Sequence, residues 1–146
     1  MSLNKSKDIR ELKKFDIDLE FGQQWEKYID DLFCGAKKAE IKTERDKWQK
    51  TGNICIEVES WGKPSGLETT EADVWVQNLV KDGKLLASIM IPTDVLKEIL
   101  PDVSKGTVMG GDNNASKINL VPLSKLFDRL RSVFNDRLDD VASVRD

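Results

Sequence analysis

Apolar residues recur at helical spacing in two parts of the chain. Between residues 22 and 33 they follow one another at intervals of three and four, and Gly35 comes soon after, which predicts an amphipathic helix that ends there. From residue 122 to about residue 144 a second stripe predicts an amphipathic helix that packs on the core or forms the seam of a homodimer. Its members are Leu123, Leu126 or Phe127, Leu130, Phe134, Leu138 and Val141. Residues 1–14 are polar and charged, so we expect an N-terminal arm or a helix end.

Strict alternation of apolar and polar residues marks strands between these helices. It occurs at residues 39–43 and 53–60, and the turn-forming residues 51–53 lead into the second segment. We therefore expect these two strands to pair as a hairpin with a long loop. Residues 73–80 and 84–91 predict a second pair of strands around a Lys-Asp-Gly turn.

Three shorter elements complete the pattern. They are a single helical turn capped by Thr69 or Thr70, a short helix that begins at Thr93 and is stopped by Pro101, and a brief strand at residues 118–122. This order of elements is typical of an α+β domain. We expect residues 15–121 to form its core, with a central mixed sheet of about four to five strands flanked by helices.

Composition narrows the class of protein. At 146 residues, with 39% hydrophobic and 34% charged residues, the chain has the make-up of one globular domain. No apolar run approaches the length of roughly 20 residues that is needed to span a bilayer. The N-terminal region also lacks the apolar stretch of a secretory signal, so we expect a cytoplasmic protein. Histidine is absent, which excludes Ser-His-Asp and Cys-His catalysis and histidine-bound zinc. Any enzymatic chemistry must use carboxylates, lysines or hydroxyls.

Charge is distributed unevenly along the chain. The net charge is −3, but residues 37–50 contain six basic residues against three acidic ones, a local charge of +3. The candidates for contact with a DNA backbone or with exposed bases are Lys47, Lys50, Lys63 and Ser65, with Trp48 and Trp61 among them. Tryptophans near strand ends also pack in cores, and that interpretation stays open.

Charged side chains occupy alternate positions of the first two strands. Glu40 and Lys42 share one face of the first strand, and Glu57 and Glu59 share one face of the second. If the apolar faces of a hairpin turn toward the core, all four charged side chains lie on the same side. Strands about 4.8 Å apart then bring the carboxylates of Glu40 and Glu57 close enough to share one divalent ion. The alternative is a solvated sheet face, which alternating glutamate and lysine most often form.

These residues resemble the motif of the PD-(D/E)xK nuclease superfamily, which has the restriction-endonuclease-like fold. Glu40-Ile41-Lys42 matches the E-x-K element, and Glu26 lies in the preceding helix, where the family carries a glutamate. The stretch EIKTERDKWQKTGNICIEVESWGKPSGLETTEADVW also resembles small phage-type proteins of this superfamily. The resemblance covers roughly residues 18 to 91.

Two alignments of the motif give different roles to the same residues. In the first, Glu40 and Lys42 are the catalytic pair, and Glu57 supplies the second carboxylate from the next strand. In the second, Glu40 takes the first acidic position, and Glu57 and Glu59 form the (D/E)-x-K element with Glu59 in place of lysine. Both alignments imply Glu40 and Glu57 as ligands of Mg²⁺ or Mn²⁺ and Glu26 as an outer helper.

The resemblance implies a divalent-metal-dependent endonuclease that hydrolyses the phosphodiester bonds of DNA. Its activity would be of a phage type or selective for DNA structure, and a phage-encoded form would act in the host cytoplasm. The alternative is a catalytically inactive nuclease-like domain that binds nucleic acid or takes part in assembly.

Overall fold

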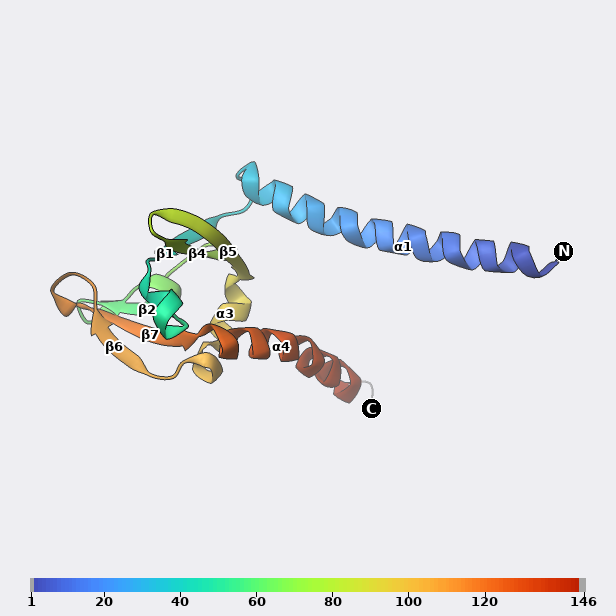
Figure 1. The fold of residues 1–146 in the computed structure, drawn as a ribbon. Coiled ribbons are helices and arrows are strands. Elements are labelled where there is room, and N and C mark those ends of the chain that lie inside the picture. Colours follow the sequence, from blue (N-terminus) through green and yellow to red (C-terminus); the bar gives the residue numbers. More distant parts are fainter. Residues whose placement is uncertain (1, 145–146) are drawn as a thin grey trace. The chain divides into compact units, whose positions relative to one another are not determined.

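The computed structural model describes residues 2–144, with the side chains of residue 14 and residues 19–133. The chain divides into two units, Met1–Lys38 and Ala39–Asp146. Helix α1 (Ser2–Phe33) makes up most of the first unit (Figure 1). It extends the helix expected over residues 22–33 toward the N-terminus and includes residues 2–14.

The second unit contains two sheets instead of the single central sheet expected. Sheet A has the strand order β1-β4-β5, with β1 (Ala39–Glu44) parallel to β4 (Val74–Lys81) and β4 antiparallel to β5 (Lys84–Pro92). Sheet B is antiparallel, with the order β3-β2-β7-β6. Its strands are β2 (Asn53–Ser60), β3 (Lys63–Pro64), β6 (Thr107–Gly110) and β7 (Ser116–Pro122). The α+β class is confirmed, and the single sheet is not.

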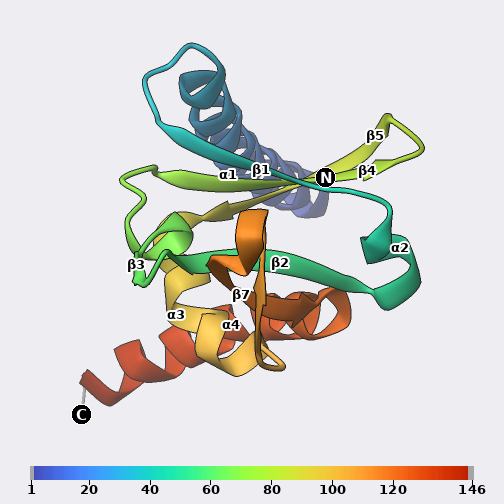
Figure 2. The same ribbon diagram turned by 90° about the vertical axis from the view of Figure 1, so that its left-hand side faces the viewer.

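Helices and 3-10 turns connect and cover these sheets. They are α2 (Lys47–Thr51), η1 (Gly66–Glu68), α3 (Thr93–Val103), η2 (Asp112–Asn114) and α4 (Leu123–Val144). Helices α3 and α4 contact each other and strand β7 (Figure 2). The C-terminal helix therefore packs on its own core along the part whose side chains are described, through Leu123, Leu126, Leu130 and Val133.

The core joins both sheets to these helices. Ile56 of β2, Trp75 of β4 and Leu96 and Ile99 of α3 are each 0% exposed, and Val121 of β7 is equally buried. Complete burial of such a side chain contributes about 1.5–3 kcal/mol to folding. The spacing of Leu96, Ile99 and the other apolar residues of α3 makes that helix amphipathic, so one of its faces seals the core.

The expected hairpin of the first two strands is wrong. Strands β1 and β2 belong to different sheets, and β1 pairs in parallel with β4, in the register Ala39↔Val74 to Glu44↔Leu79. The connection between β1 and β2 folds into helix α2 instead of the long hairpin loop that was expected. Alternation predicted the strands correctly but could not identify their partners.

Smaller expectations also need correction. Helix α3 continues two residues past Pro101 to Val103, which is only 1% exposed, and the burial of this side chain favours the continuation. Thr93 does not cap this helix: it is the first helical residue, and its Oγ1 has no hydrogen-bond partner among the described residues. The single turn η1 lies before Thr69 rather than after it. Strand β6 occupies residues expected to be loop.

Candidate functional site

Strand β1 turns its charged residues toward the buried side of sheet A. Glu40 is paired with Trp75 and Lys42 with Gln77, so these charged side chains share a face with two residues of β4 that are 0% and 1% exposed. Ile41, on the opposite face, is 61% exposed. The expectation that the apolar face of β1 points to the core is therefore wrong. The reason is that the buried amide of Gln77 on this face of β4 needs a polar partner, which Glu44 of β1 supplies.

Glu40 and Lys42 form an ion pair at the border of this face. Lys42 Nζ lies 2.8 Å from Glu40 Oε1 and 5.9 Å from the centre of the Trp75 ring, which favours a cation at that point. The Thr70 hydroxyl donates to Glu40 Oε2 at 3.4 Å. About a third of each charged side chain is exposed, 35% for Glu40 and 37% for Lys42, so a ligand from solution can contact both.

Strand β2 behaves as the sequence predicts and directs its apolar face inward. Ile54 and Ile56 are 1% and 0% exposed, whereas Glu57 is half-buried. The Ser116 hydroxyl of β7 donates to Glu57 Oε1, and the Ser65 hydroxyl donates to Oε2 at 3.2 Å. Both carboxylate oxygens are therefore held in a fixed orientation.

One short segment, residues 65–70, contacts both carboxylates, and we call it the 65–70 turn. At its start Ser65 binds Glu57, and at its end Thr70 binds Glu40. A hydrogen bond of 3.0 Å from the Thr70 amide to the Gly66 carbonyl closes the turn. Gly66 has φ +54°, and a Cβ atom there would lie 2.2 Å from the Glu57 carbonyl oxygen, so only glycine lets the turn lie this close to β2.

The remaining candidates of the second unit lie around this turn and on α2. Glu59 is half-buried, next to a bulge of β2, and is paired with Pro64 and Lys117. Lys63 is exposed on β3, and Lys47 and Lys50 are exposed on α2. The Ser65 hydroxyl donates a hydrogen bond to Glu57, so this hydroxyl has a partner without a bound phosphate. The predicted DNA contacts of the three lysines stay predictions.

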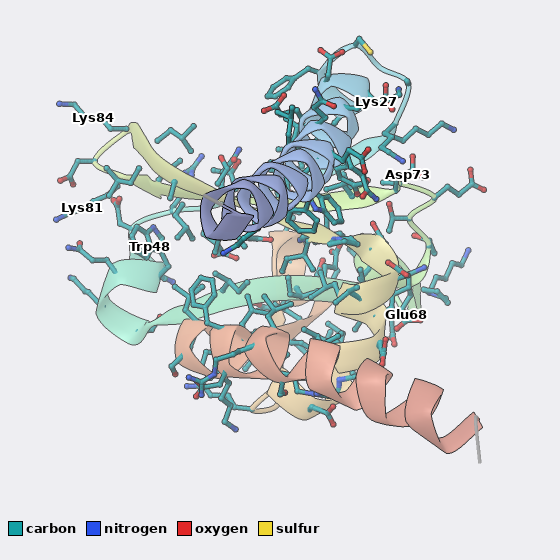
Figure 3. The ribbon with its side chains drawn as sticks, turned by 90° about the vertical axis from the view of Figure 1, so that its right-hand side faces the viewer. Lys27, Trp48, Glu68, Asp73, Lys81 and Lys84 are labelled. Atoms are coloured by element: carbon teal, nitrogen blue, oxygen red, sulfur yellow. The ribbon has the colours of Figure 1, made fainter. Side chains whose placement is uncertain are left out.

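The two tryptophans in this region have different surroundings. Trp48 packs against the core, and its indole N–H donates to the Val80 carbonyl at 2.8 Å (Figure 3). Trp61 is 70% exposed, with φ +53° in the turn after β2. Core packing therefore accounts for Trp48, whereas Trp61 is accessible for stacking.

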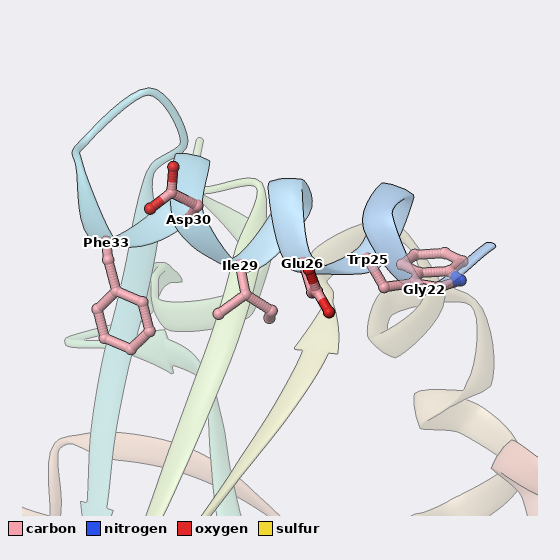
Figure 4. A pocket seen from close by; sticks show the side chains of 6 residues that line it. All are labelled: Gly22, Trp25, Glu26, Ile29, Asp30 and Phe33. Atoms are coloured by element: carbon pink, nitrogen blue, oxygen red, sulfur yellow. The ribbon is translucent and has the colours of Figure 1, made fainter. Parts of the chain in front are cut away.

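Glu26 lies on helix α1 in the first unit. Together with Trp25, Ile29 and Phe33 it lines a hollow of ≈ 520 Å³ on that helix (Figure 4). Phe21 and Trp25 of the same helix meet edge to face, with ring centres 6.0 Å apart. The role of Glu26 as an outer helper stays a prediction.

Sequence reasoning missed Glu44, the third charged residue on the buried face of β1. Its Oε1 accepts hydrogen bonds from the Cys55 amide at 2.5 Å and from Gln77 Nε2 at 3.0 Å, and Gln77 in turn accepts from the Trp75 indole at 2.9 Å. Burial raises the pKa of Glu44, and the hydrogen bond from Cys55 opposes this change. Glu44 thus joins the end of β1 to β2 across the two sheets. Glu44 continues the same alternation that led us to Glu40 and Lys42, so this pattern could have identified it.

Thr70 and Ser116 were also missed, for a different reason. Thr70 binds Glu40, which lies 30 positions away in the chain, and Ser116 binds Glu57, which lies 59 positions away. No local pattern indicates such contacts.

No protein-family model, curated protein or solved structure matches this chain. Within the described residues, no three or more aspartate, glutamate or cysteine side chains gather in an arrangement that could bind a metal. No helix in the described part of the chain has the length and apolarity needed to cross a membrane.

Proposed function

We propose that the chain is a divalent-metal-dependent endonuclease that hydrolyses phosphodiester bonds of DNA where β1 meets the 65–70 turn. The observation that carries this proposal is that both carboxylates contact the same turn, Glu57 through Ser65 and Glu40 through Thr70. Lys42 lies beside Glu40. The proposal therefore assigns a carboxylate–lysine pair at one end of the turn and a second carboxylate at its other end to one substrate.

Mg²⁺ or Mn²⁺ suits this set of donors. Mg²⁺ is usually bound through one or two carboxylates, keeps several waters and takes the remaining oxygens from substrate phosphates. A cluster of three protein ligands, which the described residues lack, is not needed for such coordination. Glu40 and Glu57 would hold the ion. When bound, it lowers the pKa of a coordinated water and neutralises charge on the phosphate.

The chain's own groups have separable roles in this proposal. Lys42, held near the Trp75 ring and partly exposed, offers a positive charge to the phosphate oxygens, on which negative charge grows in the transition state. The hydroxyls of Thr70, Ser65 and Ser116 orient the two carboxylates. Ligands held this way spend less free energy on ordering when substrate binds.

The contacts favour the first of the two alignments. Glu40 and Lys42 form a pair within one strand, and Glu57 approaches from another. Both alignments take Glu57 from the strand that follows β1, and because β1 and β2 do not pair, the 65–70 turn provides the link between Glu40 and Glu57 in either case. We keep Glu59 as an assisting group next to Glu57 and Glu26 as an outer helper. A restriction-endonuclease-like core is part of the proposal, and it rests on the motif rather than on the strand order.

DNA binding without hydrolysis is the second candidate, and one observation favours it. Each oxygen of Glu57 has a serine partner, and Lys42 is already paired with Glu40. Buried and half-buried carboxylates with purely structural roles are satisfied in the same way. In that case the exposed lysines of α2 and β3 would hold the DNA backbone.

Cleavage assays separate these candidates. The full chain is incubated with supercoiled, linear, single-stranded and branched DNA in Mg²⁺ or Mn²⁺. We expect cleavage that a chelator abolishes and that Glu40→Gln, Glu57→Gln or Lys42→Met lowers roughly 10²–10³-fold, because each removes one charged group from the transition state. Glu68→Gln, at an exposed glutamate of η1, is the matched control and should leave the rate unchanged. Binding without cleavage supports the second candidate, and the absence of both contradicts the two candidates together.

A further inference from the structure

A cavity of ≈ 530 Å³ lies at the C-terminal end of β1, in the size range of ligand pockets in proteins. It is enclosed by the end of β1, helix α2, the start of β2 and strand β7. The lining residues that bear on its chemistry are Glu44, Arg45, Lys47, Asn53, Cys55 and Leu120. The function proposed above uses none of them except Lys47, as a contact to the DNA backbone.

The cavity follows the candidate site along one strand face. Glu44 lies on the same face of β1 as Glu40 and Lys42, and a two-residue step along a strand is about 6.6 Å. The cavity wall therefore begins about one such step beyond Lys42. Successive nucleotides of a stacked strand are only about 3.4 Å apart along the helix axis, which is shorter than this step. The nucleotide that reaches the cavity from a phosphate bound at Lys42 is therefore an unstacked one on an extended strand.

Two polar groups in the cavity have unused hydrogen-bonding capacity. Glu44 Oε1 accepts from the Cys55 amide and from Gln77, but Oε2 has no hydrogen-bond partner among the described residues. The half-buried side-chain amide of Asn53 likewise makes no hydrogen bond to a described residue, and it offers both donors and an acceptor. Such groups fix the orientation of a ligand edge that carries donors and acceptors of its own.

The other walls fit a flat apolar ring with a phosphate attached. Leu120 and Cys55 form apolar surface, and burial raises the pKa of the Cys55 thiol above its usual value of 9.0, so the sulfur is uncharged at neutral pH. Arg45 and Lys47 are exposed and line the same cavity, where they can contact phosphate. The lining thus combines apolar surface, two polar groups with unused hydrogen-bonding capacity and two cations. It also includes the Asp46 carboxylate, whose Oδ1 accepts a hydrogen bond from the Asp82 amide.

We infer that this cavity binds one unstacked nucleobase of the DNA strand, and that it prefers bases that carry an exocyclic amine, such as adenine and cytosine, over thymine, the one DNA base without such an amine. Glu44 Oε2 accepts from that amine, and the Asn53 amide pairs with the ring edge. Arg45 and Lys47 hold the adjacent phosphate. The inference rests on the proposed function for its substrate, and it assigns a base preference that the phosphodiester chemistry alone does not provide.

Binding of single nucleotides tests the cavity without catalysis. The probes are dAMP, dCMP and dTMP, titrated into the full chain and followed by NMR at the Cys55 amide, which binds Glu44. We expect dAMP and dCMP to bind roughly 5- to 150-fold more tightly than dTMP, the range that corresponds to about 1–3 kcal/mol for a matched base contact. Equal affinities, or no shift at Cys55, would overturn the inference.

Variants on one helix and two strands make the test specific. Asn53→Ala should remove most of the preference over dTMP, and Lys47→Ala should weaken all three nucleotides alike. Lys84→Ala is the matched control for Lys47, because it removes the same charge from an exposed lysine of β5 that does not line the cavity. An effect of Lys84→Ala equal to that of Lys47→Ala would assign binding to the general surface charge and contradict the inference.

Cleavage of oligonucleotides that carry one abasic position separates this inference from the proposed function. If DNA is cut and one abasic position next to the cut slows cleavage, the result supports both the proposed endonuclease and the cavity inference. If DNA is cut but no abasic position matters and no nucleotide binds, the endonuclease stands and the cavity inference fails. If adenine and cytosine nucleotides bind selectively but no DNA is cut, the inference stands as a binding site and the endonuclease fails.

Discussion

Strands β1 and β2 have similar alternating sequences, yet they bury opposite kinds of residue. In β2 the isoleucines point into the core, and Ile56 is 0% exposed. In β1 the isoleucine points outward, and Ile41 is 61% exposed, while Glu40, Lys42 and Glu44 share a face with buried Trp75. The same pattern thus forms a core wall in one sheet and a polar inner face in the other.

The difference arises from the strands that each one pairs with. Strand β2 pairs with β7, whose Val121 is 0% exposed, so an apolar face can close against apolar neighbours. Strand β1 pairs with β4, where the buried Gln77 needs polar partners and Glu44 supplies one. A buried amide without a partner would cost about 1–3 kcal/mol. The polar face of β1 is therefore directed inward by the polar residue beside it.

The largest expected effect comes from shortening the two isoleucines in turn. Ile56→Ala should lower the free energy of unfolding by about 2–5 kcal/mol, because it leaves a cavity in the core. Ile41→Ala should change it by no more than about 0.5 kcal/mol, as exposed substitutions do. Urea denaturation of both variants measures the difference. A similar loss of stability in the two variants would mean that β1, like β2, buries its apolar face.

The second prediction concerns the turn that joins the two regions. Gly66→Ala places a Cβ atom 2.2 Å from the Glu57 carbonyl oxygen, whereas Gly83→Ala, also at positive φ, meets open space. Both substitutions carry the backbone strain of a left-handed residue, so Gly83→Ala is the matched control. We expect Gly66→Ala to be less stable than Gly83→Ala by about 1–3 kcal/mol, the usual range for overpacking. Equal losses in urea denaturation would show that the 65–70 turn does not lie against β2.

Sequence reasoning identified most elements because their patterns are local. The strands at residues 39–43 and 53–60 and the C-terminal helix follow from alternation and helical spacing, which each segment carries in itself. The pairing of β1 with β4 involves residues about 35 positions apart, as in Glu40↔Trp75, and no pattern within β1 encodes that partner. Glu40 and Glu57 lie on strands as predicted, but their link through the 65–70 turn depends on the close approach that Gly66 permits.

The smallest expected effect is a pH dependence at Glu44, where the two regions meet. Burial raises its pKa in the folded chain, and the hydrogen bond from Cys55 only partly offsets this, so the folded state holds the proton more tightly than the unfolded state does. Stability contributed by Glu44 is therefore lost as the pH rises from about its unfolded value of 4.5 through its folded pKa. Glu44→Gln keeps an oxygen for Cys55 and Gln77 but cannot ionise. The free energy of unfolding of this variant, relative to the unmodified chain, should thus rise between pH 4 and pH 7, measured by urea denaturation at each pH. A relative stability that falls over this interval would mean that the hydrogen bonds to the Glu44 carboxylate outweigh its burial.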